Sequence, residues 1–462
     1  MHKKVLMMLV VLLLAIGITG AQDDDPLAGV DPSGQTVTYW HEWDNLQLEA
    51  MNRIIADFNE TNEFGITVVA QEYGTSSLLR DAISAGITSG ELPNLAGAAF
   101  VNNAQGYFLD GILVTLDDYV DHPEYGIADD VNINQQVLDI NRPALEPFGG
   151  QLLNWPVGIS GNVLSTNLDH LDALREAGAI DFEGTVTNFD DFRAAACAYD
   201  QLTLPDGTAL NGGFAMRIGS PELYDFINNF GGFVFDEENN RYDFTNEGAI
   251  TAMQYLQDLY NDGCAYIPDG GTFENTGQFS LGLNIFAGGS SVGVPFIQGD
   301  IDENVEANGD DWDWNWVNAT FPWTEDNRTA QTFLRGVAIL ESTPEQNLAT
   351  WLFLRHWATN EDAQVVWTEF AQYQPYNTDT FANLSEQFLD ENAPFTSFAE
   401  ALDSDDIELW ASPSHPQSFD ISDVAGTLYS NITIGEMDVM EAAEMAEAEA
   451  NEIYEEALED LE

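Results

Sequence analysis

Aromatic and small polar residues stand where several expected strands of this sequence end. They are Trp40, Glu42 and Trp43 after a first β-branched and aromatic run, Tyr73 and Thr75 after a second, and Asn102 and Asn103 after a third. Aromatic rings stack on the apolar faces of sugars, and carboxylates, amides and hydroxyls bind their hydroxyl groups. No Gly-rich phosphate loop such as G-x-G-x-x-G follows the first strand, so these strand ends suit a polar small molecule.

Each of these residues also has a plain structural explanation. One of the two tryptophans is expected to pack in the core, and the Glu42 side chain can simply face solvent. The asparagines Asn102 and Asn103 can form a turn. The residues alone leave both interpretations open.

The run 150–167 (GQLLNWPVGISGNVLSTN) combines glycines with small polar residues. Because Pro156 cannot donate to a sheet ladder and glycine relaxes the backbone, we expect a strand that leaves one sheet, passes through an irregular segment and enters a new element. That segment contains Ser160 and Asn162. A hinge between two lobes needs such a crossing, although an ordinary loop is the alternative.

Four further polar or aromatic positions stand in apolar, strand-like surroundings. Ser290 and Ser291 follow a double glycine, and Trp323 ends a Trp-rich run. Arg335 interrupts the strand expected at 332–340, where it can act either as a fork for a ligand or as a salt bridge between lobes. The sequence slightly favours the salt bridge.

The elements that position these residues alternate between strand and helix. We expect strands at 36–40, 66–72, 95–100, 212–218 and 332–340, and helices at 46–59, 77–87, 106–113, 222–230, 246–260, 344–358, 362–370 and 437–462. This alternation predicts an α/β fold with a mostly parallel sheet. In such sheets ligands bind beyond the carboxyl ends of the strands.

The N-terminus has the pattern of a secretory signal peptide at 1–22, followed by an acidic, flexible lead-in at 23–34. Two lysines precede an apolar stretch of about fourteen residues and then small residues, which is too short for a membrane span. No cysteine stands near the expected cleavage site. We therefore expect a soluble exported protein without a lipid anchor, and an uncleaved N-terminal anchor is the alternative.

The formal net charge is −67, from 12 basic and 79 acidic residues, and the only lysines are Lys3 and Lys4. So acidic a surface repels nucleic acid and anionic membranes, and we therefore expect neither of them as a partner. Salt weakens the repulsion within the chain. A saline habitat is our hypothesis, and an ordinary acidic secreted protein is the alternative.

The chain has two cysteines, Cys197 and Cys264. Export and an even count favour a disulfide, with two buried thiols as the alternative. The six histidines have no metal-ligand spacing, and no H-E-x-x-H, G-x-S-x-G or Ser-His-Asp pattern occurs. We therefore expect no metal, no cofactor and no enzyme, although a secreted carbohydrate-active enzyme with a carboxylate pair and a surface-layer protein are the other classes considered.

Several segments in a fixed order give the sequence a family resemblance over 36–461. They are TVTYWHEW, SGELPNL, LDGILVTLDDYV, WPVGISGNVLSTN, VTNFDDFRAAACA, FTNEGAITAMQYLQDLYNDG, SLGLNIFAGGSS, RGVAILESTPEQNLATWLFLRHWATNEDAQVVW and YQPYN. In these the chain resembles the extracellular solute-binding proteins of ABC importers, family 1, which bind sugars or glycerol 3-phosphate. Two departures are the missing lipoprotein cysteine and the absence of lysine after Lys4.

The resemblance implies two α/β lobes joined by hinge segments, with a ligand cleft between them. Lobe one would comprise 35–157 and 286–333, and lobe two 160–285 and 337–462. Crossings would lie near 158–163, 283–288 and 334–338. The disulfide would then lie within lobe two, where it does not restrict closure.

The resemblance also implies a set of ligand-binding residues. They are Trp40, Glu42, Trp43, Tyr73, Thr75, Asn102, Asn103, Ser160, Asn162, Ser290, Ser291, Trp323, Arg335 and Tyr373. Because the chain offers one plausible arginine and much negative charge, a neutral sugar or short oligosaccharide is favoured. Glycerol 3-phosphate or a glycerophosphodiester is the alternative. The implied protein is a monomer that delivers its ligand to a membrane permease.

Overall fold

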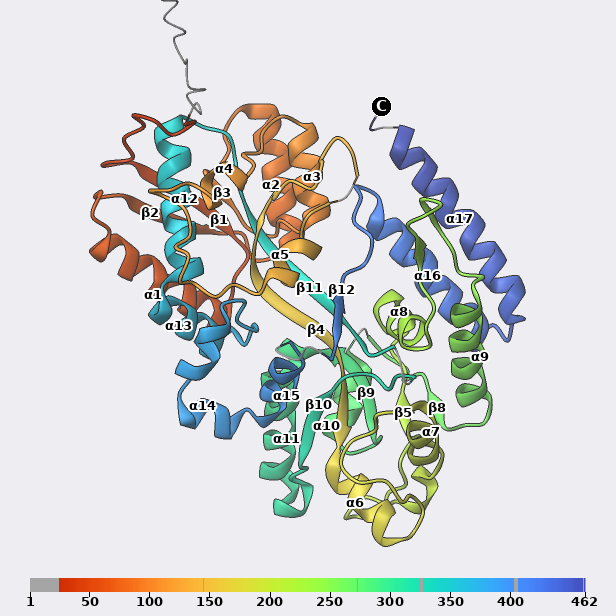
Figure 1. Cartoon of the computed structure of the whole chain (residues 1–462). Coiled ribbons are helices and arrows are strands. Elements are labelled where there is room, and N and C mark those ends of the chain that lie inside the picture. The colour runs from red at the N-terminus through yellow and green to blue at the C-terminus, as the bar shows by residue number, and fades with distance from the viewer. Residues whose placement is uncertain are drawn as a thin grey trace, which may run out of the picture.

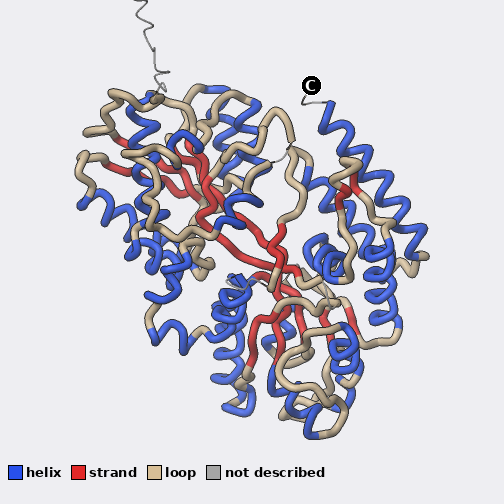
Figure 2. The backbone as a smooth tube through the Cα atoms, in the orientation of Figure 1, coloured by secondary structure: helices blue, strands red, loops and turns tan. Residues whose placement is uncertain are grey.

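The chain folds into two lobes that share one long sheet (Figures 1 and 2). The computed structural model describes residues 25–459 and 461, apart from 144, 272, 325, 326 and 403–405. The predicted signal peptide lies outside the described residues. None of the helices in the described part of the chain is both long enough and apolar enough to cross a bilayer.

The first lobe is a parallel sheet of β1 (Thr36–His41), β2 (Thr67–Glu72) and β3 (Leu95–Ala96), with helices on both faces. The helices are α1 (Asn45–Thr61), α2 (Ser76–Ser89), α3 (Val101–Leu109), α4 (Asp117–Val120), α5 (Gln135–Ile140), α12 (Pro344–Thr359) and α13 (Glu361–Ala371). Side chains of α1, α12 and α13 form a core with one face of β1, and side chains of α2 and α3 pack with β3 in another cluster.

The second lobe has β5 (Phe214–Ala215), β8 (Ala265–Tyr266) and β9 (Phe286–Ser290) in parallel, and β10 (Trp316–Ala319) pairs with β4. Its helices are α6 (Leu168–Glu176), α7 (Phe189–Cys197), α8 (Ser220–Asn229), α9 (Glu247–Asn261), α10 (Glu274–Ser280), α11 (Val294–Asn308), α16 (Ser418–Thr433) and α17 (Val439–Glu459). Short elements complete it: η1 (Tyr199–Gln201), η2 (Ser291–Gly293), η3 (Asp310–Trp312) and a hairpin of β6 (Phe235–Asp236) and β7 (Arg241–Tyr242).

Two long antiparallel strands, β4 (Trp155–Asn167) and β11 (Thr329–Ile339), run through both lobes. The order of the main sheet is β2-β1-β3-β11-β4-β9-β5-β8. A third connection returns from the first lobe through η4 (Thr378–Asn383), α14 (Glu386–Glu391), α15 (Ala393–Leu402) and β12 (Glu408–Trp410), which pairs with β11. Phe398 of this connection packs on Val163 of β4 and Ala330 of β11.

Local sequence explains where many helices begin and end. The Thr343 side chain accepts a hydrogen bond from the backbone of Gln346 at the start of α12, and Pro344 follows as its first residue. Asn246 caps α9 in the same way. Gly90 ends α2 with φ +78°, a left-handed conformation that glycine adopts without strain.

The packing of the described residues differs from the predicted division into lobes. Residues of 286–333, which includes β9, α11 and β10, pack in the second lobe, because β9 pairs with β4 and β5. Helices α12 and α13, predicted for lobe two, pack in the core of the first lobe. The apolar residues near the predicted crossing at 283–288, such as Ile285, lie within the core of the second lobe.

The prediction of an irregular backbone at 158–163 is also wrong. Here β4 is one continuous strand of 13 residues, and all of them are buried. Its glycines serve close packing, because a Cβ on Gly158 would lie 2.9 Å from the Tyr373 ring and one on Gly161 would lie 1.9 Å from Phe398. The strand nevertheless passes from one lobe to the other at this point, as the hinge interpretation requires.

Cys197 and Cys264 form the predicted disulfide, between the end of α7 and the residue that precedes β8. Both residues belong to the second lobe, so the bridge does not link the lobes. The described part of the predicted lead-in is packed on the first lobe. Leu27 is buried in its core and the Asp25 carboxylate lies 3.1 Å from Nε2 of His122.

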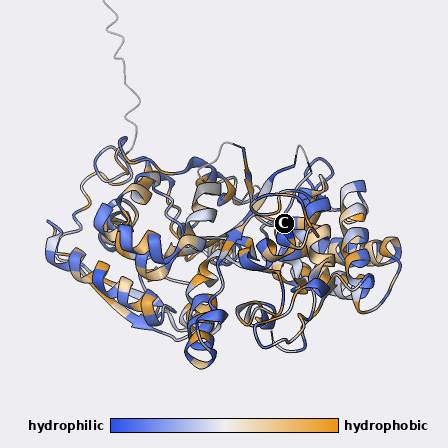
Figure 3. Cartoon of the chain, turned by 90° about the horizontal axis from the view of Figure 1, so that it is seen from below, coloured by the Kyte–Doolittle hydropathy of each residue, from blue (hydrophilic) through white to orange (hydrophobic). Residues whose placement is uncertain are grey.

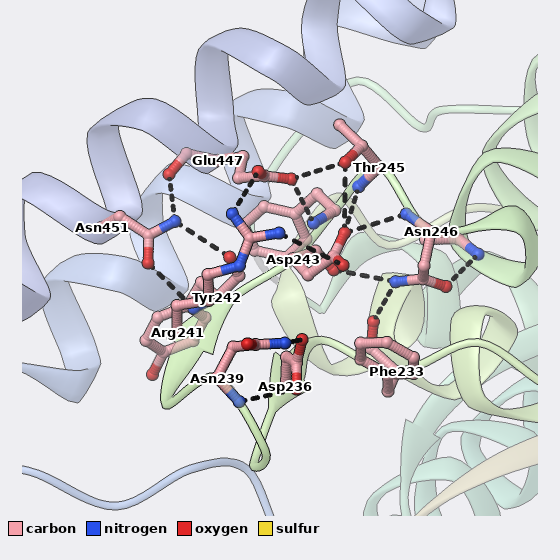
Figure 4. Close-up of polar contacts among 12 residues, drawn as sticks. Phe233, Asp236, Asn239, Arg241, Tyr242, Asp243, Thr245, Asn246, Glu447 and Asn451 are labelled. Carbon is pink, nitrogen blue, oxygen red and sulfur yellow. Dashed lines mark hydrogen bonds and ion pairs between the residues drawn. The ribbon is translucent and has the colours of Figure 1, made fainter.

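Polar contacts hold the C-terminal helix α17 on the β6–β7 hairpin (Figure 4). Asn451 exchanges two hydrogen bonds of 2.9 Å with the backbone of Tyr242, and Glu447 accepts from the hydroxyl of Thr245 at 2.8 Å. The Arg241 guanidinium lies 3.6 Å from Glu447. In Figure 3 the helices carry both hydrophilic residues, in blue, and hydrophobic residues, in orange.

Candidate functional site

The carboxyl ends of the parallel strands of both lobes point at the same place. In the first lobe β3 runs antiparallel to β11, with Ala96 opposite Ala338, so its carboxyl end faces the middle of β11. In the second lobe β9 runs antiparallel to β4, with Ser290 opposite Asn162. Because ligands of α/β proteins collect beyond these strand ends, the junction around the middle of β4 and β11 is the candidate site.

An ion pair between Glu42 and Arg335 lies at this junction. The Nε and Nη2 atoms of Arg335 donate to Oε1 of Glu42 at 2.9 and 2.8 Å, and Nη2 also donates to the hydroxyl of Ser76 at 2.6 Å. The backbone N–H of Ala98 donates to the same carboxylate oxygen at 3.1 Å. Arg335 therefore ties the crossing strand β11 to the first lobe, and its ion pair does not join the two lobe cores.

Burial raises the pKa of Glu42 above its ordinary value, and the Arg335 guanidinium opposes that shift. Burial also disfavours the charged form of Arg335, but Tyr373 and Glu42 outweigh it and raise the pKa of Arg335. The second carboxylate oxygen of Glu42 is buried without a hydrogen-bond partner among the described residues. The possibility that Glu42 simply faces solvent is thus wrong.

Aromatic rings surround this pair. Trp43 is fully buried, as expected for one of the two tryptophans, and its ring lies 4.9 Å from the Arg335 guanidinium. Tyr373 receives a hydrogen bond of 3.4 Å from Nη1 of Arg335. Trp40 and Tyr73 are half-buried, with ring centroids 5.0 Å apart at the ends of β1 and β2. Their partly open rings can accept the apolar face of a ligand.

A second polar centre, on α8 of the second lobe, holds two buried carboxyl groups. Asp225 accepts from the side-chain amide of Asn162 at 2.7 Å and from the backbone N–H of Gln331 at 3.2 Å. Glu222 accepts from the hydroxyl of Tyr429 at 2.7 Å and from the backbone of Arg217 at 3.2 Å. Burial raises the pKa of both acids to about 8, against the effect of these donors.

The structure brings some of the other predicted residues into this junction and places others elsewhere. Ser291 accepts a hydrogen bond of 3.0 Å from the backbone of Gly161, beside the buried Ser160. Ser290 ends β9. Trp323 lies in the segment that follows β10, where its ring is 4.5 Å from the Arg328 guanidinium. Among the described residues, no hydrogen bond, ion pair or ring contact joins Trp323 to Glu42 or Arg335.

The predicted third strand is shorter than expected, which moves two asparagines. Asn102 and Asn103 lie in the first turn of α3, whereas the sequence placed them at the end of a strand. Thr75 caps α2 by accepting from the backbone of Leu78 at 3.2 Å, so its hydroxyl already has a structural role.

Sequence reasoning missed Ser76, Glu222 and Asp225. Ser76 stands one residue from the predicted Thr75. The two acids could have been noticed in the sequence, because they stand among Leu223, Phe226 and Ile227, three apolar residues of the same helix. Charged residues at such buried positions indicate partners supplied by other elements.

The chain matches the model of the bacterial extracellular solute-binding proteins over residues 53–394. It belongs to this family. No curated protein sequence matches the chain. For this solute-binding protein the predicted two-lobed α/β fold is confirmed by similarity to solved structures of periplasmic binding proteins.

Three solved structures illustrate the similarity. The cyclic α-maltosyl-1,6-maltose binding protein of Arthrobacter globiformis has a TM-score of 0.69 and 19% identity, over 90% of this chain and 98% of that one. The sugar-binding protein MalE of Xanthomonas citri has a TM-score of 0.71 and 15% identity, over 91% and 97%. The maltose/maltodextrin-binding domain of Bdellovibrio bacteriovorus, bound to maltotriose, has a TM-score of 0.62 and 15% identity, over 90% and 99%.

Proposed function

We propose that this solute-binding protein captures a neutral sugar or short oligosaccharide between its two lobes and delivers it to the permease of an ABC importer. The observation that carries the proposal is the half-buried Trp40–Tyr73 ring pair at the ends of β1 and β2, where the strand ends of both lobes converge. In the chain, Trp40 closely precedes Glu42, and Tyr73 closely precedes Ser76, the hydroxyl partner of Arg335. Aromatic faces next to charged and hydroxyl-bearing groups are the usual lining of a carbohydrate site. The similar solved structures of a sugar-binding protein and of a maltose/maltodextrin-binding domain support this class of ligand.

A neutral ligand fits the electrostatics of the junction better than a phosphate. Binding of a phosphate calls for cationic forks that are free to receive it. The Arg335 guanidinium is already matched by the Glu42 carboxylate and the Ser76 hydroxyl, and the chain as a whole carries a formal charge of −67. Glycerol 3-phosphate is therefore the alternative ligand that the binding experiment must exclude.

Family membership and composition support a proposal about where and how the protein works. We propose that the protein is exported, acts as a monomer without catalysis, and works in a saline habitat. Export suits the extracellular family and the disulfide. The saline habitat is supported by the excess of 79 acidic over 12 basic residues, because salt screens their mutual repulsion.

A thermal-shift screen of the full chain against maltose, maltotriose and glycerol 3-phosphate, in low and high salt, tests the proposal. A ligand that binds only the folded state stabilises it by about 2.7 kcal/mol at a hundredfold excess over Kd. We expect Trp40→Leu to lose the shift, and Phe182→Leu, which lies against the core of the second lobe beside Arg175, to keep it. A shift with glycerol 3-phosphate alone would contradict the neutral-ligand proposal, and silence across a wider sugar panel would contradict the carbohydrate role.

A further inference from the structure

The two strands that cross between the lobes pair with each other over a short stretch. Gly161 faces Thr332, Ser160 faces Phe333, Ile159 faces Leu334 and Gly158 faces Arg335. Between Arg335 and Gly336 the pairing register of β11 with β4 shifts, and the regular pairing of the two strands ends there on the side of the first lobe. Any bending of one lobe against the other must be absorbed near this ladder.

The first lobe holds one end of the ladder. Ile159 and Leu334 belong to its hydrophobic core, and the indole N–H of Trp367 donates to the carbonyl of Val157 at 2.6 Å. Arg335 is bound to Glu42 as described above. The crossing strands are therefore fixed to the first lobe up to the Ile159–Leu334 pair.

The second lobe holds the other end through the pairing of β4 with β9 and of β11 with β12, and through one side chain that reaches both strands. Asn162 and Gln331 each lie one residue beyond the Gly161–Thr332 pair, on opposite strands. One carboxylate oxygen of Asp225 accepts from the amide of Asn162, and the other accepts from the backbone N–H of Gln331. A single buried residue of α8 thus binds both crossing strands at matching positions.

We propose that Asp225 is the positioning residue of the hinge. Together with the pairing to β9 and β12, it fixes both strands to the second lobe, so that bending is confined to Ser160–Gly161 and Thr332–Phe333, between Asp225 and the core of the first lobe. This deepens the proposed capture of a ligand by closure and rests on it for its biological consequence. The hinge itself is testable without any ligand.

Glu222 supplies a closely matched control on the same helix. Like Asp225 it is buried, and it accepts from one backbone N–H and one side-chain donor. Its partners, Arg217 and Tyr429, do not belong to the crossing strands. Asp225→Ala and Glu222→Ala therefore remove equivalent sets of hydrogen bonds, and only the first touches the hinge.

Hydrogen exchange of the ligand-free full chain, read by mass spectrometry, tests the proposal. We expect Asp225→Ala to speed exchange in peptides over 157–166 and 328–336 by about tenfold, the effect of losing a buried hydrogen bond. Glu222→Ala should leave these peptides unchanged. Asp225→Asn should restore slow exchange, because the amide still accepts from Gln331 while Asn162 can reverse its own amide.

Equal acceleration of both crossing strands in the two alanine variants would overturn the proposal, and so would uniform acceleration over the whole chain in Asp225→Ala. If Asp225→Ala does not fold, Asn162→Ala removes only the link to β4, and it should speed exchange in 157–166 but not in 328–336. Absence of that difference would also overturn the inference. A failure of the proposed function would instead show as absence of sugar binding, with the exchange pattern intact.

Discussion

The Glu42–Arg335 ion pair allows a quantitative prediction of the free energy of unfolding in variants that lack one or both partners. Arg335→Met removes the guanidinium but keeps much of its apolar length, and it leaves the buried Glu42 carboxylate with the Ala98 N–H as its described donor. Glu42→Gln removes the negative charge and retains an oxygen for Ala98. The double variant removes both charges together.

The structure sets the expected magnitudes. Breaking a fully buried ion pair by removing one partner costs about 3–5 kcal/mol. The Arg335 side chain is 24% exposed, so solvent screens part of the interaction and we expect Arg335→Met to cost about 2–3 kcal/mol. Glu42→Gln should cost about 1–2 kcal/mol, since hydrogen bonds replace the ion pair. The double variant should cost less than the sum, with a coupling energy of about 1.5 kcal/mol.

Urea unfolding at fixed salt, followed by tryptophan fluorescence and circular dichroism, measures these free energies of unfolding. Arg53→Met is the control, because it removes an exposed pair with Glu49 in α1, whose side chains are 51% and 48% exposed. Such surface pairs contribute less than about 1 kcal/mol. The reasoning is refuted if Arg335→Met costs no more than Arg53→Met, or if the coupling energy is below about 0.5 kcal/mol.

Three further predictions concern other parts of the structure. Burial raises the pKa of Glu222 to about 8, so the folded protein binds this proton more tightly than the unfolded chain does. The free energy of unfolding should therefore fall as pH rises from about 5 to about 8. In unfolding curves measured over this pH range, Glu222→Gln should reduce the dependence of this free energy on pH. Replacing Cys197 and Cys264 by serine opens a loop of 67 residues and should lower the free energy of unfolding by about 4 kcal/mol in a urea titration, and an unchanged midpoint would refute this. Gly161→Ala should cost about 1–3 kcal/mol through overlap with Phe398, whereas Gly106→Ala, with no atom within 4 Å, should be neutral or stabilising in the same titration.

The order of strands and helices could be predicted from the sequence because each element carries its own pattern. The 3.6-residue spacing of Met51, Ile54, Ile55 and Phe58 gives α1, and the β-branched run at 36–40 gives β1. Shorter elements were misjudged. The third strand was expected at 95–100 but ends at Ala96, because the following residues enter α3.

The division into lobes could not be predicted from local patterns. The family resemblance implied a crossing near 283–288, but Gly288 pairs with β4 inside the second lobe, where it leaves room for the Glu222 carboxylate. The glycines of β4 were interpreted as flexible backbone, whereas they make space for aromatic rings that arrive from residues 373 and 398. In both cases the reason for glycine lies in a distant part of the chain.

The candidate site was predictable in part. Trp40, Glu42, Tyr73 and Arg335 stand at strand ends or inside an apolar strand, where polarity or aromaticity is visible in the sequence. That Arg335 pairs with Glu42, some 293 residues away, depends on the sheet order and has no local signal. The contact of Asp225 with both crossing strands depends on the same tertiary arrangement.

Calorimetric titration of the full chain with maltotriose, and separately with glycerol 3-phosphate, tests whether the protein captures a neutral sugar. We expect saturable binding of a neutral sugar at one site per chain, its loss in Trp40→Leu, and no saturation with glycerol 3-phosphate. Saturation with glycerol 3-phosphate, or a folded protein that binds neither maltotriose nor any other neutral mono- or oligosaccharide, would contradict it.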